Sequence, residues 1–264
     1  MPFAKLLALF GRKQSVRIPQ ELWIRTLASL PFCARLDADE LARLRSLCER
    51  FLHEKEFATA GGLELSNAMT VSIAVQGCLP ILNLGLEAYR DWVGIVVYPD
   101  EFVIPRKVED ETGVVHEYDD IASGEAWDGG PLLISWHDAQ MAGEGYNVVI
   151  HEFAHKLDML NGEADGVPPL PAGISRPRWE AALLAAYEDF CAQVDEAEAR
   201  GVDDTAFDPY AAETPGEFFA VMSEAFFETP ALLRGEYPDF YALLCCFYRQ
   251  DPAARDEALQ EAAP

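Results

Sequence analysis

The amino-acid sequence predicts an α+β fold that is mainly helical and contains one small mixed sheet. Apolar residues recur at helical spacing through the first 90 residues. Short β-branched or apolar runs follow between residues 93 and 136, and they are typical of strands. Helical spacing returns at residue 146 and continues to about residue 249. At 264 residues the chain is long enough to bury a substantial core around these elements.

The N-terminal region is expected to be a flexible tail over residues 1–16, followed by a helical part over residues 17–90. A first helix begins at Ile18-Pro19, because proline is favoured in the first turn of a helix. A second helix begins at Asp37, which has a glutamate three positions later in the pattern of a capping box. Residues 63–84 are rich in Ala, Val, Leu and Ile and predict a third helix.

Three strands are expected in the middle of the chain. Residues 93–98 form a β-branched run that stops at Pro99, which is typical of a buried strand. Residues 114–118 are a second candidate. Asp128-Gly129-Gly130 is a turn signal, and the apolar run at 132–136 after it predicts the third strand.

The remaining chain is predicted to be helical. The expected helices cover residues 146–160, 178–200, 217–227 and 232–249. A proline- and glycine-rich loop is expected over 161–176, and the alanine- and glutamate-rich segment 251–264 is expected to be frayed. Residues 91–250 are expected to pack with residues 17–90 as one integrated unit.

The composition argues against several classes of function. The chain has 45 acidic and 20 basic side chains, a net charge of −25, which disfavours nucleic-acid and anionic membrane partners. No stretch reaches the roughly 18 apolar residues of a membrane span. Six cysteines without a Cys-x-x-Cys pair indicate neither a disulfide framework nor a cysteine zinc site. Free thiols suggest a reducing compartment, so we expect a cytoplasmic protein. From the negative charge we expect no nucleic-acid or membrane partner.

The sequence His-Glu-Phe-Ala-His at 151–155 is the pattern H-E-x-x-H. Residues four apart lie on one face of a helix, so His151 and His155 can bind one ion, and neutral imidazole is a preferred zinc ligand. Glu152 lies beside that face, where it can take a proton from an attacking water and pass it to a leaving amine. Structural zinc sites usually have four protein ligands, mostly cysteine, and no cysteine lies near this motif in the sequence.

A catalytic zinc site also needs a third protein ligand and an open fourth position. Three histidines are candidates by residue type, namely His53, His116 and His137. Three carboxylates share one face of the helix that follows Pro215, and they are the alternatives: Glu217, Glu224 and Glu228. Periodicity alone does not choose among these residues.

Two more polar residues, Asn147 and Asp158, lie near the two histidines on the predicted helix. All four lie on one face, within an arc of about 80° around the helix axis, given about 100° per residue. Asp158 is too far along the axis to bind the ion easily together with both histidines. We therefore expect it to orient an imidazole, and the alternative is an ordinary polar residue at a helix end.

Three segments resemble the Mlc titration factor A (MtfA) family of bacterial cytoplasmic zinc peptidases, namely residues 151–158, 161–170 and 209–227. The resemblance extends upstream to Gly61-Gly62-Leu63-Glu64-Leu65 and covers roughly residues 18–250. The half that carries the motif also resembles the catalytic domain of anthrax lethal factor, which shares the arrangement Tyr-x6-Glu-Phe-Phe-Ala.

This resemblance implies a zincin-type metallopeptidase fold in residues 91–250, with an active-site helix that carries H-E-x-x-H and one Zn²⁺ per chain. It implies that Glu217 is the third ligand and that Tyr210 is a catalytic tyrosine, whose phenol can donate a hydrogen bond to an oxyanion. Ser223 and Glu224 are expected to support the ligands.

In zincins a strand at the sheet edge aligns the substrate backbone. Here we expect residues 132–136 to be that strand, which makes four residues candidate substrate contacts: Leu133, Ile134, Ser135 and Trp136. The alternative is a core strand without substrate contact.

The predicted function is that of a zinc-dependent peptidase of the gluzincin-like kind, and the resemblance implies aminopeptidase-type activity on short peptides. The family is named for sequestering the glucose repressor Mlc, so a Mlc-like transcriptional repressor is a candidate partner. The alternative is a non-catalytic regulatory protein in which zinc is structural or vestigial. A complete zinc set favours the enzyme, because a pure binding module has no need of Glu152 and Tyr210.

Overall fold

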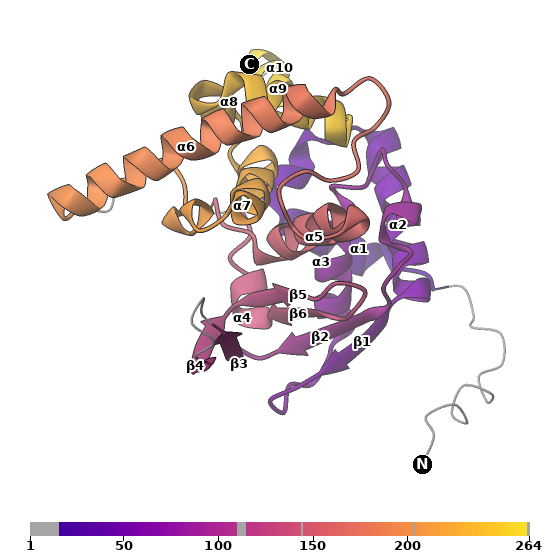
Figure 1. The fold of residues 1–264 in the computed structure, drawn as a ribbon. Coiled ribbons are helices and arrows are strands. Elements are labelled where there is room, and N and C mark those ends of the chain that lie inside the picture. The colour runs from indigo at the N-terminus through magenta and orange to yellow at the C-terminus, as the bar shows by residue number, and fades with distance from the viewer. Residues whose placement is uncertain (1–15, 110–114, 144, 203, 263–264) are drawn as a thin grey trace.

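In the computed structural model, a group of helices lies over a small sheet, and a separate β-hairpin projects at one side (Figure 1). The residues described are 16–109, 115–143, 145–202 and 204–262, with side chains described except at 106–118 and 120. The prediction of a mainly helical protein with a small mixed sheet is confirmed. The expected tail over 1–16 lies outside the described residues except for its last position.

The helices of the described residues are α1 (Gln20–Ala28), α2 (Ala38–Glu54), α3 (Asn67–Cys78), α4 (Trp136–Ala139), α5 (Val148–Asp158), α6 (Arg176–Arg200), α7 (Pro215–Glu228), α8 (Pro230–Glu236), α9 (Pro238–Tyr248) and α10 (Pro252–Ala262). The strands are β1 (Glu56–Thr59), β2 (Gly94–Tyr98), β3 (Phe102–Glu109), β4 (Val115–Ala122), β5 (Gly124–Ala126) and β6 (Leu132–Ser135). Within the described residues, no helix combines the length and apolarity that crossing a membrane requires.

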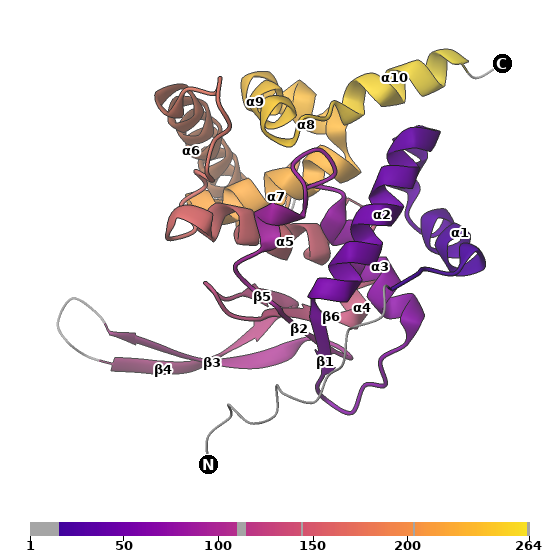
Figure 2. The ribbon, with the colours of Figure 1, turned by 90° about the vertical axis from the view of Figure 1, so that its right-hand side faces the viewer.

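The main sheet has the strand order β1-β2-β6-β5. Strands β1, β2 and β6 run parallel to one another, and β5 pairs with β6 in the antiparallel direction. Strands β3 and β4 form a separate antiparallel hairpin. One residue, Ser123, connects β4 to β5, so the hairpin leads directly into the edge of the main sheet (Figure 2).

Helix α5 lies between the main sheet and α7, and all eleven of its residues are buried (Figure 1). Phe153 anchors it in an aromatic cluster, with ring centroids 5.7 Å from Phe51, 5.1 Å from Tyr89 and 5.6 Å from Trp92. Helix α3 approaches α5 at Gly77, where an added Cβ would lie 2.4 Å from the Phe153 ring. The helix that carries H-E-x-x-H is therefore fixed from several sides at once.

Some elements differ from the sequence predictions. The helix expected over 63–84 is shorter, because Ser66 caps α3 and the helix ends at Cys78. The helix expected over 232–249 is two helices, α8 and α9, because Pro238 starts a new helix after Tyr237. Strands β1, β3 and β5 were not predicted.

The prediction that residues 251–264 are frayed is wrong over residues 252–262, which form α10. Ala253 of this helix is buried. Arg255 donates to Glu40 at 2.6 Å, and Asp256 accepts from Arg35 at 2.6 Å. These long-range contacts hold a segment whose composition alone gives no sign of tertiary packing.

Candidate active site in a cleft between two helices

His151 and His155 lie one turn apart on α5, and both are buried. The start of this helix is set by Asn147, whose side chain accepts a hydrogen bond from the Ile150 backbone N–H at 2.9 Å. Glu217 comes from the first turn of α7, where the Thr214 hydroxyl accepts from the Glu217 backbone N–H at 3.1 Å. Two capped helices therefore bring these side chains together, although Glu217 lies 62 positions after His155 in the sequence.

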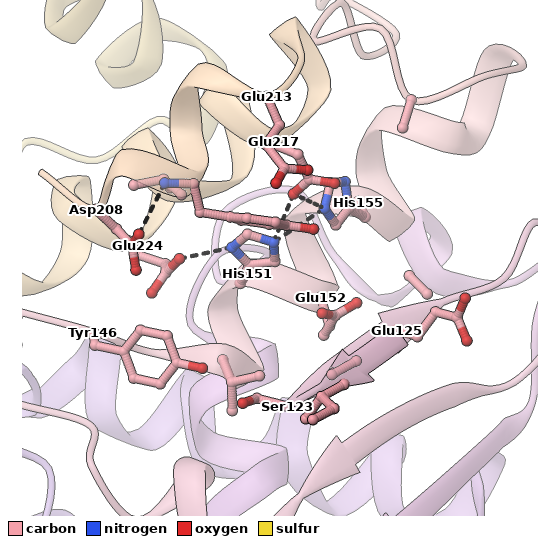
Figure 3. Close-up of a pocket in the computed structure, with 18 of the residues that line it drawn as sticks. Ser123, Glu125, Tyr146, His151, Glu152, His155, Asp208, Glu213, Glu217 and Glu224 are labelled. Carbon is pink, nitrogen blue, oxygen red and sulfur yellow. Dashed lines mark hydrogen bonds and ion pairs between the residues drawn. The ribbon is translucent and has the colours of Figure 1, made fainter. Parts of the chain in front are cut away.

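The three side chains present their donor atoms to one point. The two Nε2 atoms are 3.2 Å apart, and Glu217 Oε2 is 3.1 Å from each of them (Figure 3). Tetrahedral bonds of about 2.0–2.1 Å would separate ligand atoms by about 3.3 Å. The His-His-carboxylate set thus has the spacing and chemistry that suit a divalent ion such as zinc.

The charges of this group also suit a cation. Burial opposes a charge on His151, but hydrogen bonds to Glu217 and Glu224 outweigh it and raise its pKa well above the ordinary value. Burial also opposes the charge on Glu217, yet its hydrogen bonds to His151 and His155 hold its pKa well below the usual range. The carboxylates thus favour positive charge between the imidazoles, which a bound divalent ion would supply.

Glu224 lies behind His151 and accepts from its Nδ1 at 2.7 Å. The carboxylate also accepts from the Asn147 backbone N–H at 2.5 Å. The Asn147 side chain donates instead to Glu228, at 2.8 Å. The three carboxylates that share one face of α7 thus make different sets of contacts, a distinction that periodicity does not make. Glu217 meets both imidazole Nε2 atoms, Glu224 meets Nδ1 of His151, and Glu228 meets no imidazole among the described residues.

Glu152 is only 4% exposed and lines the cleft beside the histidines (Figure 3). Burial raises its pKa to about 7, although the nearby His151 and His155 oppose this rise. Its Oε2 has no hydrogen-bond partner among the described residues. A buried carboxylate with a pKa near neutrality is suited to accept and return a proton.

Tyr210 lies on a short 3₁₀ helix, Pro209–Ala212, that Asp208 caps by accepting from the Tyr210 backbone N–H at 2.9 Å. Its ring centroid is 6.0 Å from that of His151, and the side chain is 45% exposed. The tyrosine therefore stands at the open side of the cleft, beside His151.

The cleft between α5, α7 and β5 has a volume of about 680 Å³. Beyond the residues already described, its lining includes acidic and phenolic side chains that the sequence did not single out: Glu125, Tyr146, Asp208 and Glu213 (Figure 3). Tyr146 forms a hydrogen bond with Ser123 in the β4–β5 connection. None of the described lining residues is a lysine or an arginine, so carboxylates dominate its charge.

Two expected supporting residues lie elsewhere. Ser223 donates to the Phe219 carbonyl at 2.7 Å and accepts from the Tyr248 hydroxyl at 2.8 Å, so it joins α7 to α9. Asp158 accepts from the Gly166 backbone N–H at 2.7 Å, and no hydrogen bond joins it to an imidazole among the described residues. Asp158 thus fixes the loop after α5 rather than a histidine ring.

The other histidine candidates do not join this group. His53 lies on α2 and His137 on α4, and neither lines the cleft. The side chain of His116 lies outside the described residues.

The prediction that residues 132–136 form the edge strand of the sheet is wrong. Strand β6, which carries Leu133, Ile134 and Ser135, lies between β2 and β5, and Trp136 begins α4. The edge strand beside the cleft is β5, and all three of its residues line the cleft. Three residues, Gly-Glu-Ala, are too short to show an alternating pattern. The turn signal at 128–130 was the available clue, because a hairpin turn needs a strand on both sides.

Comparison with known proteins agrees with this geometry. Residues 10–249 match the family described as glucose-regulated metallo-peptidase M90. The chain is 41% identical over 241 residues to the Mlc titration factor A of Salmonella arizonae, covering 89% of this chain and 92% of that protein. It is 40% identical over 240 residues to the proteins of that name from Salmonella choleraesuis and Salmonella typhi. Each of these matches covers 88% of this chain and 87% of the relative.

Proposed function

Because this chain belongs to the family of glucose-regulated metallopeptidases, we propose that it is a zinc-dependent peptidase with a zincin-type, gluzincin-like catalytic part. The observation that carries this proposal is the convergence of His151, His155 and Glu217, with donor atoms 3.1–3.2 Å apart, beside the buried carboxylate of Glu152. One continuous core across residues 17–90 and 91–250 supports treating the two parts as one integrated unit.

His151, His155 and Glu217 would hold the zinc ion. When bound, the ion supplies Lewis acidity, which polarises the substrate carbonyl and lowers the pKa of a water. Glu224 holds the His151 ring through Nδ1, so that Nε2 faces the site. Asn147 fixes Glu224 in turn through its backbone N–H.

Glu152 acts as the proton carrier in this proposal. It takes a proton from the attacking water and returns it to the amine that leaves when the peptide bond breaks. Tyr210, at the open side of the cleft, donates a hydrogen bond from its phenol to the carbonyl oxygen as negative charge develops there.

We propose that β5 aligns the peptide. Among the described residues it pairs with one strand, β6, so its other side can take a substrate strand that forms main-chain hydrogen bonds. The carboxylates around the cleft, among them Glu125, Asp208 and Glu213, favour a substrate with a positively charged amino terminus. Aminopeptidase-type action on short peptides therefore fits this cleft.

A chromogenic anilide of a single amino acid tests the proposal. We expect hydrolysis by the zinc-loaded chain, loss of activity with a chelator, and recovery when zinc is restored. The N-acetylated anilide should be a poor substrate, because it lacks the positive amino group. Hydrolysis that survives complete metal removal would refute the metallopeptidase, and equal rates on both anilides would refute the preference for a free amino terminus.

A second function is supported by the relatives' printed name, Mlc titration factor A. We propose that this chain also binds a Mlc-like transcriptional repressor and so takes part in the regulation of glucose uptake, in a cytoplasm that its free cysteines suit. A pull-down of the repressor with wild type and His155→Ala separates the functions. Equal capture by both would show that repressor binding needs no metal. If wild type captures no repressor, the proposed repressor binding is refuted.

A further inference from the structure

Lys156 is a buried lysine that the proposed chemistry does not use. It follows His155 on α5 and is 3% exposed. Its Nζ donates to two backbone carbonyls of the turn between β5 and β6, that of Trp127 and that of Gly130, the latter at 3.0 Å. An ammonium group is costly to bury, so its placement on this turn calls for a reason beyond apolar packing.

The turn closes the hairpin whose outer strand is β5. Within it, the Trp127 N–H donates to the Pro131 carbonyl at 3.2 Å and the Gly130 N–H donates to the Trp127 carbonyl at 3.0 Å. Strand β5 has three residues and, within the part of the chain that the structure describes, pairs with β6 alone, so its own ladder contributes few hydrogen bonds. Lys156 adds an anchor at the end of this short strand.

The other end of β5 lies against Glu152. A Cβ added to Gly124 would lie 2.4 Å from Glu152 Oε1 and 2.6 Å from its Cγ. Glu152 and Lys156 are four residues apart and so share one face of α5. One helix face therefore contacts the hairpin twice, at the strand beside the carboxylate and at the turn.

The geometry points to Lys156 as a positioning residue that holds the β5–β6 hairpin at a fixed place beside Glu152, so that β5 can align a peptide. This inference rests on the proposed peptidase function, in which β5 binds the substrate backbone. The site needs a strand close to Glu152 without crowding it, and two charge-assisted hydrogen bonds from the same helix set that spacing.

The chain offers a matched control in Lys55. It is also buried, its Nζ donates to the carbonyls of Tyr89 and Trp92, and it lies 3.8 Å from the centroid of the Trp92 ring. Lys156 lies 5.3 Å from the same ring. The two lysines thus make the same kind of contacts around Trp92, but only Lys156 holds the hairpin turn.

The test compares Lys156→Met with Lys55→Met by hydrogen exchange and by steady-state kinetics on a short peptide. We expect amides at 124–134 to exchange at least about tenfold faster in Lys156→Met and to change little in Lys55→Met. We expect KM for the peptide to rise about tenfold in Lys156→Met with kcat within about threefold and metal retained. If Lys156→Met does not fold, Lys156→Gln replaces it in both measurements, because glutamine keeps N–H donors but removes the charge.

Unchanged exchange at 124–134 in Lys156→Met would contradict the claim that Lys156 holds the hairpin. Equal increases in both variants would contradict it too, because they would indicate a general loss of packing. Faster exchange with an unchanged KM would overturn its role in substrate alignment. Hydrogen exchange needs no turnover. If wild type fails to hydrolyse peptides, the proposed peptidase function is refuted, but the exchange rates at 124–134 still show whether Lys156 holds the hairpin.

Discussion

The α5–α7 helix pair and the β5–β6 hairpin border the same cleft but are held in different ways. The side chains that could bind a metal, His151, His155 and Glu217, come from two capped helices whose packed faces are buried. Behind them, Glu224 accepts from both His151 and the Asn147 backbone. The edge strand β5 has three partly exposed residues and one neighbouring strand among the described residues, and Lys156 holds the turn that follows it.

Because of this difference, substitutions in the two regions should impair different steps of the proposed reaction. Changes in the helix pair should alter metal binding or proton transfer, because the side chains there meet the ion or the reacting atoms. Changes in the hairpin should alter the fit of the substrate and leave the metal in place, because β5 contributes none of the ligand group. The following variants test whether the two regions are separable in this way.

The largest effect should come from Glu152→Gln. Glutamine keeps the shape of the side chain but cannot accept and return a proton, so we expect kcat to fall about 10³-fold. Bound zinc should stay at the wild-type ratio, because Glu152 is not one of the three grouped donors. Single-turnover kinetics together with elemental analysis measure both quantities. Retained turnover would remove Glu152 from its assigned role.

The next effect concerns the support of His151. Glu224→Gln should weaken zinc binding by about 10–100-fold, because the imidazole loses the carboxylate that holds Nδ1. The control is Glu228→Gln on the same helix, whose carboxylate contacts Asn147 and no imidazole among the described residues. Competition with a chelator measures both affinities. Equal weakening in the two variants would indicate a general defect of α7.

A smaller effect should follow from Gly124→Ala in β5. The new methyl group would overlap Glu152, so the strand or the carboxylate must shift. We expect kcat/KM to fall about tenfold with zinc retained. Gly94→Ala in β2 is the control, since its Cβ would lie 3.4 Å from Pro131 Cβ. An unchanged kcat/KM in Gly124→Ala would show that the hairpin is not closely fitted to Glu152.

The smallest effect on catalysis should come from Lys55, which does not line the cleft and is tested through stability instead. Burial lowers its pKa from 10.5 to about 8. Between these values the folded chain binds fewer protons than the unfolded chain, so the lysine's contribution to the free energy of unfolding rises with pH by roughly 1.4 kcal/mol per unit. The penalty for burying the ammonium is fully present below about pH 8. Denaturant titrations of wild type and Lys55→Met should diverge over this window, and a pH-independent difference would contradict the assignment.

The sequence was most informative where chemistry depends on spacing along one helix. His151, Glu152 and His155 could be selected from their positions, because a helix places them on adjoining faces. Glu217, Glu224 and Glu228 could not be separated, since they share a face and their partners are set by the crossing of α5 and α7.

Short or tertiary features escaped prediction for physical reasons. Strand β5 has too few residues for an alternating pattern, so the sequence favours β6 as the edge although it lies inside the sheet. The angular position of Asp158 suggested contact with an imidazole, but the loop after α5 returns and places Gly166 against it. Helix α10 depends on ion pairs to distant residues, Arg255 with Glu40 and Asp256 with Arg35, which local composition does not reveal.

The most direct measurement of the central claim is the zinc content of Glu217→Gln beside that of Glu213→Gln. Both glutamates line the cleft, but only Glu217 has an oxygen 3.1 Å from both imidazole nitrogens. After dialysis against limiting zinc, wild type and Glu213→Gln should hold one ion per chain, and Glu217→Gln should lose it. Zinc held by Glu217→Gln as tightly as by wild type would contradict a centre built from two imidazoles and this carboxylate.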